Sequence, residues 1–106
     1  MVEQTISLDL IFAALADSTR RSILERVSKV EMSIGEIAKH YKLTFAAIAK
    51  HIAVLERAGF IIKKRQGKEQ VVVVVPHTMD TARHHIERYA LLQSKRFSTL
   101  ESLLQK

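Results

Sequence analysis

The stretch from Leu43 to Gly67 limits what this chain can fold into more than any other. It reads LTFAAIAKHIAVLERAGFIIKKRQG. Thr44 can cap a helix at its N-terminus, and Gly59 stands where a left-handed residue ends one. Between them apolar residues recur at i, i+4 and i+7, which defines a buried stripe of Ile48, Ile52 and Leu55. The pattern predicts one helix followed directly by a hairpin.

The predicted hairpin has two strands of β-branched and aromatic residues, 60–62 and 71–75. Gln66-Gly67-Lys68 would join them, with the glycine supplying a positive φ. Pro76 closes the second strand. The segment therefore predicts a small β-hairpin, or wing, behind the helix.

The net charge of the chain is confined to this unit. Residues 39–70 hold eight basic and two acidic residues, and 8 − 2 = +6 equals the formal net charge of the whole chain. The basic residues are Lys39, Lys42, Lys50, Arg57, Lys63, Lys64, Arg65 and Lys68, and the acids are Glu56 and Glu69. A positive field limited to one helix and hairpin is typical of proteins that bind the phosphate backbone of DNA.

Three shorter helices are predicted upstream. Ser7, Asp17 and Ser33 can cap them, and Ser33 forms a capping box with Glu36, so the third should run from about residue 34 to 40. The expected inward positions are Leu8, Ile11, Phe12 and Leu15, then Ile23, Leu24 and Val27, then Ile34, Ile37 and Ala38. Arg20, Arg21 and Arg26 are expected to point outward.

The last segment, 78–106, again has helical spacing. An apolar face is formed by Ala82, Ile86, Tyr89, Ala90, Phe97, Leu100 and Leu104. A helix of about 25 residues is roughly 38 Å long, more than a small domain needs to cover its own core. A second copy of the chain is the expected partner, with the face as part of the domain's own core as the alternative. The predicted dimer interface comprises Leu8, Ile11, Ile86, Tyr89, Phe97, Leu100 and Leu104.

Two helices joined by a short turn and followed by a basic hairpin make a winged helix-turn-helix. Residues 15–24, LADSTRRSIL, resemble the "LADPTRRxIL" opening of ArsR-type transcriptional repressors. Residues 34–39 resemble their third helix, 49–60 their "SxHLxxLxxAGL" recognition helix, and 65–68 their wing. The match runs from about residue 8 to 75. It implies a homodimeric repressor that binds an imperfect palindrome in operator DNA.

In such a motif the N-terminal end of the second helix enters the major groove. The predicted DNA-binding residues on and before this helix are Lys39, Lys42, Thr44, Phe45, Ala46, Ala49, Lys50 and His51, and those on the wing are Lys63, Lys64, Arg65 and Lys68. The chain departs from the family here, because Phe45, Ala46, Ala47 and Ala49 replace the usual Ser, Gln and Thr. Such side chains can contact only thymine methyl groups, so phosphate contacts and DNA shape should carry more of the binding.

The residues of the family's metal sites are missing. Metal-sensing members carry a Cys-x-Cys pair where this chain has Ser33-Ile-Gly35, and the chain contains no cysteine at all. Of the family's Asp/His set on the last helix only Asp80 is present. No two of the five histidines lie four apart, so no metal and no cofactor is predicted. A site built across a dimer from His77, His84 or His85 remains an alternative.

The predicted whole is a single winged helix-turn-helix domain, 1–106, mainly α with a small β-hairpin wing, in which 78–106 is a dimerisation helix. No membrane segment, signal peptide or arrangement of catalytic residues stands out, which favours a cytoplasmic, nucleoid-associated protein that is not an enzyme. The expected function is a sequence-specific transcriptional regulator, a repressor. A nonspecific architectural DNA binder and a protein-interaction module are the alternatives. An unidentified small-molecule or protein effector remains open.

Overall fold

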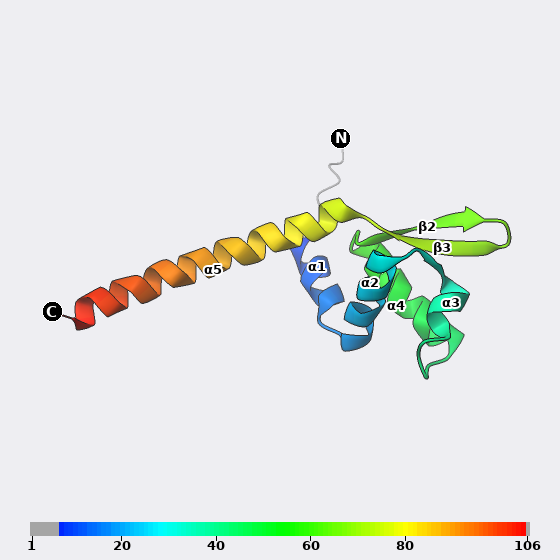
Figure 1. Ribbon diagram of the computed structural model, residues 1–106, viewed down its shortest axis with the longest axis horizontal. Coiled ribbons are helices and arrows are strands. Elements are labelled where there is room, and N and C mark those ends of the chain that lie inside the picture. Colours follow the sequence, from blue (N-terminus) through cyan, green and yellow to red (C-terminus); the bar gives the residue numbers. More distant parts are fainter. Residues whose placement is uncertain (1–6, 106) are drawn as a thin grey trace.

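The computed structural model describes residues 7–105, and it confirms the winged helix-turn-helix (Figure 1). Residues 1–6 and 106 of the predicted domain lie outside the described part. The elements in chain order are α1 (Leu8–Leu15), α2 (Ser18–Lys29), β1 (Met32–Ser33), α3 (Ile34–Ala38), α4 (Phe45–Arg57), β2 (Ile61–Gln66), β3 (Glu69–Val74) and α5 (Pro76–Leu104).

The predicted helix boundaries follow from capping residues, and these are confirmed. Ser7, Asp17 and Thr44 each accept a backbone N–H three residues on through the side-chain oxygen. Ser33 and Glu36 form the predicted capping box in both directions. Gly59 ends α4 with φ of 89°. Each cap satisfies backbone donors or acceptors that a helix end leaves unpaired.

The sheet is larger than predicted. Its strand order is β1-β3-β2, all antiparallel, and β1 pairs Met32 with Val72. A strand of two residues has no periodicity that a sequence can reveal. Strand β2 also continues through the cationic residues to Gln66, which pairs with Glu69 across a two-residue turn. Gly67 supplies the predicted positive φ of 65° in that turn.

The core lies between α1–α4 and the inner side of the sheet. Its buried apolar residues include the predicted stripes and two residues of the sheet: Ile23, Leu24, Val27, Ile37, Ile48, Ile52, Leu55, Ile61 and Val72. Helix α3 is shorter than predicted, and Ile34 and Ala38 are only partly buried.

Ile11 corrects one part of the predicted dimer interface. Its side chain is 0% exposed, because α1 packs it into the core formed with α2, α4 and α5. Buried within its own chain, Ile11 is not available to a second copy. Leu8 is partly buried against the same core.

Helix α5 leaves the domain. Its 29 residues span roughly 44 Å, and only its first turns pack on the domain, where Thr78 and Ala82 are buried. The remainder projects beyond the domain, on the side opposite the wing (Figure 1). The radius of gyration is 18.2 Å, against about 13 Å for a compact chain of this length. No helix in the described part of the chain is long and apolar enough to cross a membrane.

Candidate nucleic-acid interface

Helix α4 presents an exposed face opposite its buried stripe. Its N-cap Thr44 and the side chains of Phe45, Ala46 and Lys50 are exposed, and Ala49 is half-buried. The Ile48 stripe fixes the helix on the core, so this other face must point away from it. The exposed Lys39 and Lys42 lie in the turn before the helix.

The first half of α4 and the wing share a groove. It is lined by Ser33, Ile34, Gly35, Phe45, Ala49, Lys63, Lys68, Glu69 and Gln70. Residues of the helix and the wing that are about twenty positions apart therefore meet at one surface. The structure brings together part of the predicted DNA-binding set in this groove.

Two cations of the wing have partners within the chain. Lys63 Nζ lies 3.3 Å from the carboxylate of Glu56, and its side chain is only 27% exposed. Arg65 Nε donates to the carbonyl oxygen of Gly67 at 3.2 Å, which supports the hairpin turn. Lys64 and Lys68 are exposed. The wing therefore presents Lys64, Arg65 and Lys68 to solvent, and Lys63 is held back towards α4.

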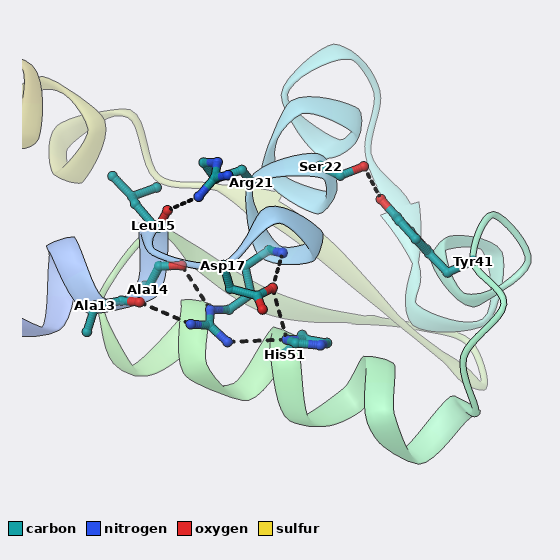
Figure 2. A network of polar contacts seen from close by, with 9 residues as sticks. Ala13, Ala14, Leu15, Asp17, Arg21, Ser22, Tyr41 and His51 are labelled. Atoms are coloured by element: carbon teal, nitrogen blue, oxygen red, sulfur yellow. Dashed lines mark hydrogen bonds and ion pairs between the residues drawn. The ribbon is translucent and has the colours of Figure 1, made fainter.

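Arg20 does not point outward as predicted. Its Nε donates to the carbonyl oxygen of Ala14 at 2.8 Å and its Nη2 to that of Ala13 at 3.0 Å (Figure 2). The neighbouring Arg21 donates to Leu15 O at 2.7 Å. The two arginines at the start of α2 thus satisfy carbonyls that the end of α1 leaves unpaired. A sequence pattern that assigns arginine to the solvent side misses this contact.

The same guanidinium reaches α4. Arg20 Nη1 lies 3.3 Å from Nδ1 of His51, and Asp17 Oδ2 lies 3.7 Å from that nitrogen (Figure 2). The backbone N–H of Arg20 is the main reason that the pKa of Asp17 lies below its ordinary value, and the positive charge of the Arg20 guanidinium adds to the effect, while burial opposes it. His51 was predicted only as a DNA contact. It also joins α4 to the start of α2.

The turn between α3 and α4 is held by Tyr41. Its hydroxyl lies 2.7 Å from Ser22 Oγ (Figure 2) and accepts a hydrogen bond from Nε of Arg26 at 3.2 Å. The guanidinium carbon of Arg26 lies 5.5 Å from the Tyr41 ring centre, within cation–π range. These contacts tie the turn between the two helices of the motif to α2.

The described residues contain no group of three or more His, Cys, Asp or Glu side chains able to hold a metal ion. The rings of His84 and His85 stand edge to face at 5.8 Å, and the buried Nδ1 of His85 has no hydrogen-bond partner among residues 7–105. The alternative of a metal site shared between two copies stays a hypothesis.

Known proteins resemble this chain along most of its length. A helix-turn-helix domain family model matches residues 15–63. An uncharacterized HTH-type transcriptional regulator of Bacillus subtilis, YuzN, is 46% identical over 72 residues, which cover 61% of this chain and 78% of that protein. The transcriptional repressor SdpR of the same species is 34% identical over 58 residues, or 55% and 64% of the two chains. The crystal structure of the ArsR family regulator RHA00566 superposes with a TM-score of 0.76 at 30% identity, over 82% of this chain and 96% of that one.

Proposed function

Because the chain belongs to the ArsR family of winged helix-turn-helix transcriptional regulators, we propose that it is a sequence-specific repressor that binds a palindromic operator as a homodimer. One observation supports the proposal: within the segment that holds the whole net charge, helix α4 and the wing share a groove, to which they contribute Phe45, Ala49, Lys63 and Lys68. Such a repressor acts in the cytoplasm, on the nucleoid.

In this proposal the N-terminal half of α4 enters the major groove. Lys39, Lys42 and Lys50 contact phosphates beside it and fix the register of the helix on the duplex. The exposed wing cations follow the neighbouring phosphate row. If a dimer neutralises about six phosphates, log affinity falls against log salt with a slope of roughly −5.

Base recognition rests on apolar contacts. Phe45 is 58% exposed on the first turn of α4, beside the exposed Ala46 and the half-buried Ala49. The thymine methyl is the apolar group that the major groove offers, so these residues favour thymine-containing half-sites. Replacing thymine by deoxyuridine at those positions removes the methyl groups and nothing else, and we expect it to lower affinity.

The dimer surface is the unpartnered face of α5. Its exposed members are Ile86, Tyr89, Leu92, Phe97, Leu100, Leu103 and Leu104, each 51–83% exposed. Tyr89, Leu92, Phe97 and Leu100 line one groove along the helix. Leu92 and Leu103 were not in the predicted interface, although their exposure matches that of its members. A two-fold axis at this face would present two reading helices to two inverted half-sites.

The test is a selection from random duplex DNA, followed by comparison of the winner with a scrambled duplex at one salt concentration. A palindromic winner preferred by more than roughly 10³-fold supports the repressor. Tight binding without a consensus indicates an architectural DNA binder, for which the alanine-rich start of α4 gives the reason. No binding at low salt rejects both and favours a protein-interaction module.

A further inference from the structure

His51 has one ring nitrogen engaged inside the protein and one free. Nδ1 faces Arg20 and Asp17, and Figure 2 shows the second nitrogen on the side of the ring away from them. Within residues 7–105 Nε2 makes no hydrogen bond and is not buried, and the side chain is 23% exposed. The free nitrogen is therefore the one that a ligand can reach.

We propose that Arg20 is a positioning residue that fixes the tautomer and orientation of His51, so that His51 offers its Nε2–H to DNA as a hydrogen-bond donor. The inference rests on the proposed function, because it names how one residue of α4 reaches the duplex. The matching groups on DNA are phosphate oxygens and the acceptor atoms of the major-groove base edges.

The tautomer follows from the chemistry of arginine. A guanidinium has only donors and keeps its proton in proteins, so Nδ1 must accept the hydrogen bond from Arg20. A neutral imidazole carries one proton, which then sits on Nε2. Asp17 Oδ2, at 3.7 Å, lies beyond hydrogen-bond distance and does not compete for Nδ1 in the neutral ring.

The position of Arg20 is itself fixed by α1. Its guanidinium donates three hydrogen bonds in different directions: Nε to Ala14 O at 2.8 Å, Nη2 to Ala13 O at 3.0 Å, and Nη1 to His51 Nδ1. The guanidinium is planar, so it cannot rotate to follow His51 without losing a bond to α1. The end of α1 therefore determines where the His51 ring stands, and a displacement of α1 moves it.

Arg21 provides a matched control. It caps the same helix end through one bond to Leu15 O at 2.7 Å but has no bond to α4. Arg20→Met and Arg21→Met each remove a cation and a cap from α1, and only the first releases His51. The test compares the affinities of the two variants for the selected and scrambled duplexes, and it determines the His51 tautomer by long-range ¹H–¹⁵N correlation.

We expect the wild type to show the Nε2–H tautomer. Arg20→Met should mix the two tautomers and lower affinity for the selected duplex roughly tenfold, the effect of one hydrogen bond to a charged group, with Arg21→Met within about twofold of wild type. His51→Ala leaves the caps on α1 in place and should lose as much as Arg20→Met. His51→Gln keeps a terminal N–H donor and should recover most of the affinity.

Two results overturn the inference: an Nδ1–H tautomer in the wild type, or His51→Ala binding the selected duplex as well as wild type does. The second test does not depend on Arg20→Met folding. A wild-type protein that binds no duplex at low salt refutes the proposed function instead, so the two failures are distinguishable.

Discussion

Replacing Leu100 by serine should weaken the proposed dimer strongly. Leu100 is 58% exposed on the apolar face of α5. Full burial of a leucine side chain contributes about 1.5–3 kcal/mol, so covering this exposed fraction contributes about 0.9–1.7 kcal/mol. A symmetric dimer covers the residue twice, which gives about 2–3.5 kcal/mol in all. The dimer dissociation constant should rise by roughly 30- to 300-fold.

Leu91 is the matched control for this change. It is 57% exposed on the same helix, but nine positions from Leu100 at about 100° per residue place it half a turn round, on the opposite face. Leu91→Ser removes the same side chain from the same kind of surroundings. We expect its effect on dimerisation to be less than about threefold.

Sedimentation equilibrium across a range of protein concentrations measures both variants against wild type. Circular dichroism should show the same helix content at high concentration, where both variants are dimeric. Equal dissociation constants for Leu100→Ser and Leu91→Ser would refute the reasoning, because the face that carries Leu100 would then not be the dimer surface. A wild-type protein that stays monomeric at all concentrations would refute it as well.

Three further predictions follow from other contacts. Lys50→Ala combined with Arg65→Ala should lower affinity for every duplex and flatten the salt slope by roughly 2 to 4, as filter binding at several salt concentrations would show, with unchanged affinity as the contrary result. Thr78→Val removes the 2.6 Å hydrogen bond to the carbonyl of Gly59 and should cost about 1–2 kcal/mol, or roughly 5–10 °C in Tm by calorimetry. The Ser33 backbone N–H holds the pKa of the Glu36 carboxyl below its ordinary 4.5, so the stabilisation from this hydrogen bond is present above pH 4.5 and is lost as the pH falls through the folded pKa. The free energy of unfolding of Glu36→Gln should therefore depend less on pH in acid, and an unchanged dependence would count against the capping box.

The fold could be predicted from sequence because its determinants are local. Ser7, Asp17, Ser33 and Thr44 mark four helix starts through bonds that span three residues. Helical periodicity then identifies the buried stripes. Strand β1 was missed because two residues cannot show a period, and its pairing with β3 depends on contacts distant in sequence.

The candidate site could be predicted only in outline. Charge counting located the surface, but it could not tell that Lys63 is paired with Glu56 or that Arg65 supports its own turn. Arg20 reads as a solvated cation in any periodicity argument. Its bonds to α1 and α4 could not be predicted from spacing, because they form only once the chain folds and the end of α1 lies beside α4. The assignment of Ile11 to the dimer interface was wrong for the same reason, since helical spacing does not say which neighbour covers an apolar side chain.

The projection of α5 has an evolutionary consequence. The residues that would determine dimerisation specificity lie on the distal turns of α5, outside the core that positions α4 and the wing. Substitutions at Leu92, Phe97 or Leu103 can therefore change pairing preference without disturbing the surface that carries the charge. If the chain pairs through α5 as proposed, two copies produced by a gene duplication can stop pairing with each other while both keep the same DNA-binding surface. Dimerisation specificity and DNA recognition can therefore evolve independently in such a lineage.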